Sequence, residues 1–346
     1  MRWLLAPLAL LLPAVALAEE DDAARIDAML DAFDASQEPA WDVRLVGVDL
    51  VPGVGSSNDD YAHQVRVLSV NAIGGLSAGL TGAEVGGVFN LHSDFAHGVQ
   101  AAGVFNVVDG PRSGVQGAGV FNAVDGPSSG VQGAGVFNVV DGDVYGVQAA
   151  GVFNVVAGDV HGIQAGLLNV DSGTVSGVQI GIINVADDVH GLPIGLVNIY
   201  PHGRLHVDAW MDETAQLSQG IEHGSRRFHN LYALGFNPVR PLDLSATAGF
   251  GVHFDLFGPI YADVDGLLRW NRVQGVEPGT LNFQQTLRAV AAWQLAPHVA
   301  VFGGPSWNVL TTGCGAPEGR KVEILDDSGE IHTYAWPGFQ IGFRFI

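Results

Sequence analysis

Two residues of this chain are of a type that can act as a nucleophile. Ser77 lies in GLSAG, which matches the G-x-S-x-G pattern of hydrolases, and Cys314 is the only cysteine. A nucleophile elbow needs a strand, a sharp turn and a helix, whereas a Gly-rich, strand-like run surrounds Ser77. No His stands close to Cys314 to activate it, and a single cysteine excludes an intramolecular disulfide. We therefore expect neither residue to be catalytic.

A second candidate group combines one histidine with three carboxylates. His206 and Asp208 share one face of a predicted strand, and Asp212 and Glu213 follow closely. A barrel enzyme can assemble Asp and His side chains from several strands. A barrel-embedded hydrolase is therefore a remote alternative.

The remaining histidines form no pattern typical of a metal site. His97, His161 and His190 each stand directly before the opening Gly of a repeat, where turn-edge residues are expected. The H-E-x-x-H motif, the P-loop and the dinucleotide-binding signature are all absent from the sequence. We expect no catalytic, cofactor-binding or metal-binding residues, no cofactor, and a protein that is not an enzyme.

Tandem repeats occupy the centre of the chain. From Gly98 the units read GVQAAGVFNVVDGPRS, GVQGAGVFNAVDGPSS, GVQGAGVFNVVDGDVY and GVQAAGVFNVVAGDVH, after which they shorten. Such self-similarity indicates one structural unit per repeat. Each unit contains one asparagine as a structural landmark, with spacings of sixteen, then fifteen, then fourteen residues. These landmarks are Asn90, Asn106, Asn122, Asn138, Asn154, Asn169, Asn184 and Asn198.

Each long unit is typical of β-structure. Asp-Gly pairs at 109–110, 125–126 and 141–142 favour the positive φ angles of tight turns. Between them lie Pro-free runs of about eleven residues, rich in Val, Phe and Ala. Helical spacing is absent, so the expected fold class is all-β.

Two all-β architectures fit the repeats. In an up-and-down (meander) transmembrane β-barrel, each unit is one strand and one turn, and about eleven residues cross a bilayer with tilt. The single turn signal per unit, the meander-like segments after Arg204 and the aromatic C-terminal FQIGFRFI favour this barrel. Counting strand-like segments predicts roughly 16–18 strands and a lumen wide enough to hold water.

The alternative is a β-solenoid of 14–16-residue coils followed by a smaller antiparallel β domain. In a solenoid the repeated asparagines would stack as a ladder, each bonded to the next coil. The shorter units support it, because Gln164 and Asn169 are five residues apart where Gln100 and Asn106 are six apart. A one-residue change within a strand would turn every later side chain to the other face.

The N-terminus and the domain boundaries follow from composition. Residues 1–18 carry an early positive charge, an apolar stretch and a final A-x-A, which predicts a signal peptide. The acidic segment 19–40 is expected to be a short helix or disordered extension. The β domain then covers 41–346, with tandem repeats at 86–204 and meander strands at 205–346.

Charge limits the partners. The formal net charge is −21, from 36 acidic against 15 basic residues. Such a chain is a poor partner for nucleic acid, whose phosphates need neutralising, and the sequence identifies no small-molecule ligand. The expected partner is the lipid bilayer of the outer membrane, where only a closed β-barrel could satisfy the strand edges.

The repeats and the segments after them resemble a known family. GVQ-x-A-G-V-F-N units, a closing PIGLVNI, then HVDAWMDET, RRFHNLYALGF, FGGPSWNVL and WPGFQIGFRF are similar to the surface repeat-containing proteins of Gram-negative bacteria. The resemblance covers roughly residues 70–346 and implies an outer-membrane or cell-surface location. It implies no catalytic residues.

Two functional hypotheses follow. The first is a non-enzymatic outer-membrane protein, acting as a passive pore or a structural barrel and exported by its signal peptide. The second is a surface adhesion or binding module built on a β-solenoid. The architecture of the repeats distinguishes them.

Overall fold

The computed structural model describes residues 41–346 except 57–59, 240–242, 273–281, 314–321 and 327–330. The predicted signal peptide, the acidic extension and Cys314 lie outside the described residues. The described residues form strands and one 3-10 turn, Tyr61–His63, which confirms the all-β fold class. In this part of the chain no helix is long and apolar enough to cross a bilayer.

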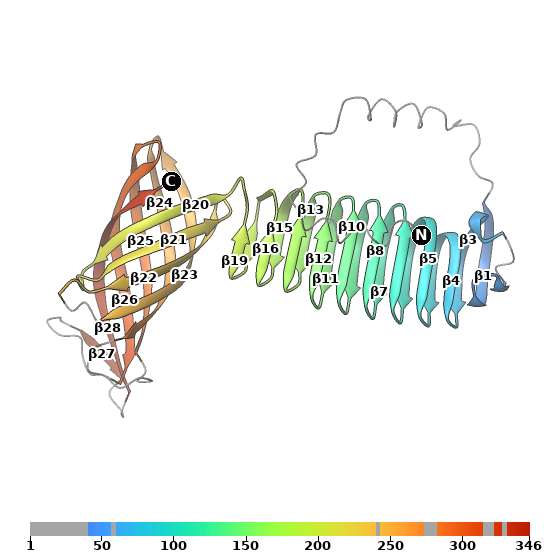
Figure 1. Cartoon of the computed structure of the whole chain (residues 1–346), viewed down its shortest axis with the longest axis horizontal. Coiled ribbons are helices and arrows are strands. Elements are labelled where there is room, and N and C mark those ends of the chain that lie inside the picture. The colour runs from blue at the N-terminus through green and yellow to red at the C-terminus, as the bar shows by residue number, and fades with distance from the viewer. Residues whose placement is uncertain (1–40, 57–59, 240–242, 273–281, 314–321, 327–330) are drawn as a thin grey trace. The chain divides into compact units, whose positions relative to one another are not determined.

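The repeats form a β-solenoid, drawn from blue to yellow-green in Figure 1. Equivalent residues pair in parallel from one coil to the next, so that Phe105 lies beside Phe121 and Asn106 beside Asn122. The alternative is therefore confirmed. The favoured barrel of roughly 16–18 strands is wrong, because the repeat units are coils and not antiparallel strands. The solenoid strands are β1 (Asp42–Val51), β2 (Val54–Gly55), β3 (Gln64–Asn71), β4 (Gly74–Gly86), β5 (Phe89–Ala102), β6 (Phe105–Asp109), β7 (Arg112–Ala118), β8 (Phe121–Asp125), β9 (Ser128–Ala134), β10 (Phe137–Asp141), β11 (Val144–Ala150), β12 (Phe153–Val156), β13 (Val160–Ala165), β14 (Leu168–Asp171), β15 (Thr174–Ile180), β16 (Ile183–Val185), β17 (Asp188–Val189), β18 (Leu192–Ile194) and β19 (Val197–Ile199).

Two ladders of side-chain amides run through the solenoid interior. The landmark asparagines are all buried. The seven from Asn90 to Asn184 each donate from Nδ2 to Oδ1 of the next coil, as in Asn106 to Asn122 at 2.8 Å. The buried glutamines form a second ladder in the opposite direction, as in Gln132 Nε2 to Gln116 Oε1 at 2.8 Å. Neighbouring coils therefore satisfy each other's buried amides along both ladders. Rows of valine, including Val108, are buried in the same interior.

A coil needs two corners, and both depend on glycine. The Asp-Gly corner has positive φ, 134° at Gly110 and 139° at Gly126, which glycine adopts without steric cost. At the other corner a Cβ atom on Gly119 would collide with the carbonyl oxygen of Gly103 in the preceding coil. The shorter units lose their residue at this second corner, between Gln164 and Asn169. Both side chains therefore stay in their ladders.

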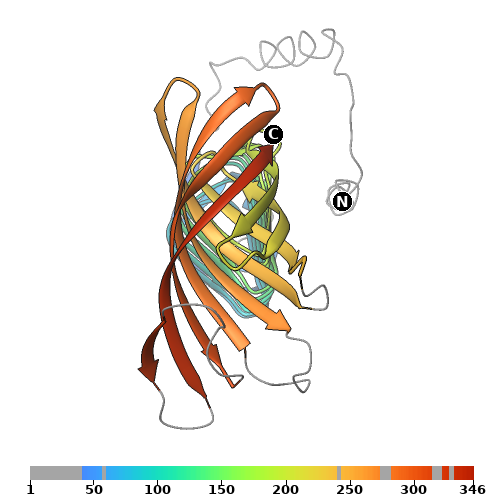
Figure 2. The same cartoon turned by 90° about the vertical axis from the view of Figure 1, so that its left-hand side faces the viewer.

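The chain after the repeats closes into an antiparallel β-barrel, seen from the side in Figure 2. Eight of the described strands form the ring, because the last one, β28, pairs with the first, β20. An additional short strand, β27, pairs with β28 outside the ring. The expected role of the aromatic C-terminal segment as a closing strand is thus seen in the structure. The strands are β20 (Arg204–Asp212), β21 (Leu217–Gly224), β22 (Phe228–Phe236), β23 (Leu244–Phe257), β24 (Ile260–Arg272), β25 (Asn282–Ala296), β26 (Val299–Thr312), β27 (Glu323–Asp326) and β28 (His332–Phe345).

Candidate functional site: the charged interior of the barrel

The barrel has charged side chains inside and apolar side chains outside. On β20 the side chains of His206, Asp208 and Asp212 are buried, whereas Leu205 and Met211 face outward. Ordinary soluble domains show the reverse, since their charged residues are almost never fully buried unless paired. The alternation of β20 therefore predicts a partner for each inward charge.

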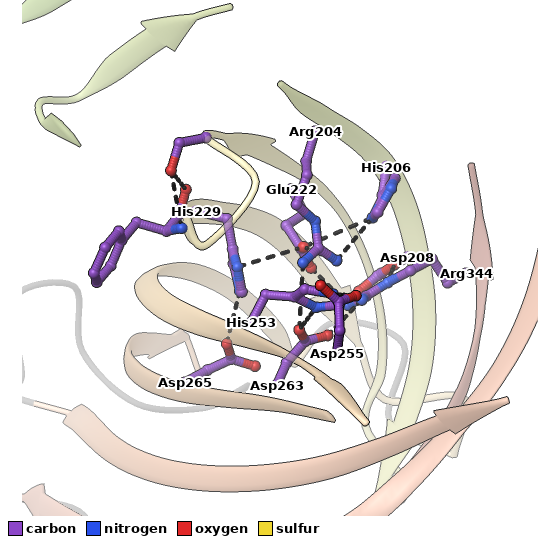
Figure 3. A network of polar contacts seen from close by, with 12 residues as sticks. Arg204, His206, Asp208, Glu222, His229, His253, Asp255, Asp263, Asp265 and Arg344 are labelled. Atoms are coloured by element: carbon purple, nitrogen blue, oxygen red, sulfur yellow. Dashed lines mark hydrogen bonds and ion pairs between the residues drawn. The ribbon is translucent and has the colours of Figure 1, made fainter. Parts of the chain in front are cut away.

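Arg344 of β28 is the centre of the interior network (Figure 3). Its guanidinium binds Asp208 of β20 through two bonds of 2.8 Å and Glu222 of β21 at 2.6 Å. It also donates to Asp263 of β24. Arg204 adds a second cation, 3.2 Å from Glu222 and 3.6 Å from Asp263. Three carboxylates from three strands thus share two arginines, which is the pairing that buried charges require.

A second group of charges lies beside this network. Asp265 accepts from His229 Nε2 at 2.8 Å and from Arg288 Nε at 2.6 Å. The Arg288 guanidinium also lies over the ring of Trp210, 5.0 Å from its centroid. Arg288, Arg344 and Trp210 have almost no solvent-accessible surface. No water-sized space therefore adjoins them, as expected of a ring of eight strands, which side chains just fill.

The four residues proposed from sequence as a remote hydrolase site do not converge. His206 and Asp208 do share the inward face of β20, but Asp208 is bound by Arg344. Asp212 accepts from Arg269 at 2.6 Å. Glu213 accepts from Trp336 Nε1 at 2.7 Å. Three different groups therefore hold the three carboxylates, at separate places. Among the described residues, no group of His, Cys, Asp and Glu has the geometry of a metal site.

Ser77, His92 and Glu84 form a row of hydrogen bonds inside the solenoid. This group was not predicted from the sequence. Ser77 Oγ lies 3.0 Å from His92 Nδ1, and His92 Nε2 lies 2.7 Å from Glu84 Oε2. The order is that of a hydrolase triad, but all three side chains are buried and leave no space for a substrate. Glu84 also accepts from Asn71 at 2.9 Å, which ties the row to the start of the asparagine ladder. Burial alone would raise the pKa of Glu84, but His92, Asn71 and Arg66 together hold it below its usual range.

Comparison with known proteins adds no assignment, because no family model, no curated protein and no solved structure matches the chain.

One carboxyl interrupts the valine row of the solenoid and predicts a pH effect. Asp171 pairs in register with Val156 and accepts from Gln164 and Gln179, each at 2.7 Å. Burial disfavours its charge more than these two bonds favour it, and it raises the pKa from 3.8 to about 7. The folded state therefore holds this proton more tightly than the unfolded chain. The stability that Asp171 contributes is complete below about pH 4 and is lost as the pH rises to about 7.

We expect Asp171→Val, which restores the residue of the long units, to stabilise the protein more at pH 7.5 than at pH 4. The gain should differ between the two pH values by at most about 4 kcal/mol, since one pKa unit corresponds to ~1.4 kcal/mol. Both glutamines keep their ladder bonds in this variant. Urea unfolding of wild type and variant at both pH values measures the difference. An equal effect at both pH values would show that folding does not raise the pKa of Asp171.

Proposed function

We propose that this chain is a non-enzymatic outer-membrane protein in which the barrel is a structural membrane anchor and the solenoid is a surface binding module. The observation that carries the proposal is the reversed polarity of the barrel. Charges are buried and paired inside, and large apolar side chains face outward. A transmembrane β-barrel shows this arrangement, with a polar interior and an apolar outer band.

The outer surface of the barrel has the composition and the dimensions of a lipid-facing band. On β25, Phe283 and Trp293 are ten positions apart, and β24 places Trp270 beside Phe283 and Ile260 beside Trp293. At ~3.3 Å per residue and a tilt of about 40°, ten positions correspond to roughly 25 Å along the barrel axis. Such a height matches an apolar band with aromatic residues at both borders. Further exposed apolar residues are Val207, Ile221, Leu234, Phe250, Phe254, Val264, Leu268, Leu287, Ile341 and Phe343.

The filled interior supports an anchor in preference to an open pore. Barrels of sixteen or more strands leave an aqueous channel, whereas about eight strands enclose a space that side chains fill. Here the arginines and carboxylates around Arg344 occupy that space.

Expression of the full chain in a Gram-negative host tests the anchor. We expect the protein in the outer-membrane fraction, with a different gel mobility before and after boiling in detergent, because a closed barrel resists unfolding by detergent alone. A chain ending before β28 is the control. It cannot pair β20 with a closing strand and should lose the boiling-dependent shift. Recovery of the full chain as soluble periplasmic protein would refute the anchor.

A further inference from the structure

The outer surface of the solenoid carries rows of apolar side chains, as that of the barrel does. One face carries a row of stacked phenylalanines whose ring centroids are 4.8–5.5 Å apart, and the opposite face carries a row of Val and Ile. The corner opposite the Asp-Gly turns forms a third row, which we call the Val edge. The face rows are Phe89, Phe105, Phe121, Phe137 and Phe153, and Val99, Val115, Val131, Val147 and Ile163; the Val edge is Val104, Val120, Val136, Val152, Leu167, Ile182 and Leu196.

The exposed carboxylates of the repeats stand at the corner opposite the Val edge. Residues 86–199 contain no Lys or Glu, and their one arginine, Arg112, is buried. The exposed aspartates Asp109, Asp125 and Asp141 stand in successive Asp-Gly corners, which we call the Asp edge. The solenoid is therefore amphipathic across its width, with two uncharged faces, one apolar edge and one acidic edge.

The interior is suited to an apolar environment. Each landmark amide bonds to its neighbours and to a backbone carbonyl, as Asn122 Nδ2 does to Gly133 O at 2.8 Å. The coils pair their backbone groups in parallel through the whole repeat region. Hydrocarbon excludes structures with unsatisfied backbone groups, and each inner coil pairs with the coil on either side of it. The solenoid interior combines amide ladders with rows of valine, and like the barrel it presents apolar side chains on its outer surface.

The dimensions and the distribution of the apolar surface favour lipid over a second protein. Eight coils at ~4.8 Å and strands of about five residues give roughly 600 Å² for each face, at the upper limit of patches that monomers expose. A second copy of the chain would cover one face, whereas lipid surrounds both faces and the Val edge. About five residues at ~3.3 Å separate the two edges. That width of ~17 Å is close to one leaflet of a ~30 Å hydrocarbon core.

We propose that the solenoid inserts edge-first into one leaflet of a bilayer, with the Val edge deepest and the Asp edge at the headgroups. Lipid hydrocarbon is then the partner of the binding module. This inference rests on the proposed membrane location and adds a second, shallower contact with the same bilayer.

Site-directed fluorescence tests the insertion in the full chain. Single cysteines are placed in a Cys314→Ser background at Val152 on the Val edge, Asp141 on the Asp edge and Leu268 on the outside of the barrel. Each is labelled with a polarity-sensitive dye, and the protein is reconstituted into phosphatidylcholine vesicles with and without doxyl-labelled lipid. We expect doxyl quenching to be several-fold stronger at Val152→Cys than at Asp141→Cys, and a blue-shifted emission at Val152→Cys.

The barrel label separates the two proposals. If Leu268→Cys is quenched by doxyl lipid while Val152→Cys emits as in water, insertion of the solenoid is refuted and the anchor stands. If both labels emit as in water, the anchor fails as well. A Val152→Cys label that is shielded from water but not quenched by doxyl lipid would show that protein covers the edge, which also refutes insertion.

Discussion

Replacing Asn122 by Val should lower the free energy of unfolding by about 3 kcal/mol or more, because each stranded buried polar group costs ~1–3 kcal/mol. Asn122 accepts from Asn106 at 2.8 Å and donates to Asn138 at 2.9 Å and to the carbonyl oxygen of Gly133 at 2.8 Å. Valine removes all three bonds at a site without solvent access. Asn106, Asn138 and the Gly133 carbonyl then each lose one hydrogen bond inside the solenoid.

Urea unfolding of the Asn122→Val variant measures the loss, with two controls from the same region. Gly117→Ala places a methyl group in open space on an outer face, and other coils carry Ala at this position. It should change stability by no more than ~0.5 kcal/mol. Deleting residues 114–129 removes Asn122 together with its whole coil and brings Asn106 next to Asn138. This deletion should fold and keep a continuous ladder. If Asn122→Val costs as little stability as Gly117→Ala, the asparagine ladder does not stabilise the solenoid.

The repeat period and the landmark asparagines are sequence features that correctly predicted the solenoid as an alternative. The preference for a barrel came from finding one turn signal per unit. The second corner is Gly119-Val120 and its equivalents, which contains no Asp, Asn or Pro and therefore resembles strand sequence. Its glycine is required by the close approach of the preceding coil, a long-range contact that local turn preferences do not encode. The shorter spacing between Gln164 and Asn169 is the better indicator of a solenoid. A corner can lose one residue without turning the later side chains to the other face, whereas a strand cannot.

In the barrel, the alternation of polar and apolar residues predicts which face of a strand a side chain occupies, but not which partner it binds. The pattern of β20 placed His206 and Asp208 on one face, as the structure has them. Their partners could not be derived in the same way. Arg344 is 136 residues from Asp208, and only closure of the ring brings β28 beside β20. The predicted strand number of roughly 16–18 is too high for a different reason, because each repeat unit is a solenoid coil and not a barrel strand.

The solenoid and the barrel both bury polar side chains, and they satisfy these groups with different partners. The two ladders inside the solenoid consist of neutral amides, which bond to identical amides one coil away and need no partner of opposite charge. An antiparallel ring cannot stack identical residues in that way. Inside the barrel, carboxylates are therefore paired with arginines from other strands. Both solutions leave the outer surface free for apolar side chains.

Arg344→Met should destabilise the barrel by about 3–5 kcal/mol or more, the usual cost of removing one partner from a buried ion pair. The variant retains most of the side-chain volume but leaves Asp208, Glu222 and Asp263 without their shared guanidinium. Arg204 still faces Glu222 and Asp263, so Asp208 should be the most affected carboxylate. The temperature at which the unboiled form disappears from detergent gels measures the effect.

Two further variants make this result specific to charge pairing. Arg272→Met removes an exposed arginine at the end of β24 and should change stability by no more than ~0.5 kcal/mol. Adding Asp208→Asn to Arg344→Met removes the carboxylate that lost both of its bonds, and should recover part of the lost stability. In the wild-type background the same Asp208→Asn change should be destabilising, since it breaks the pair from the other side. If Arg344→Met melts like Arg272→Met, the three carboxylates find other partners, and the network around Arg344 does not hold the barrel closed.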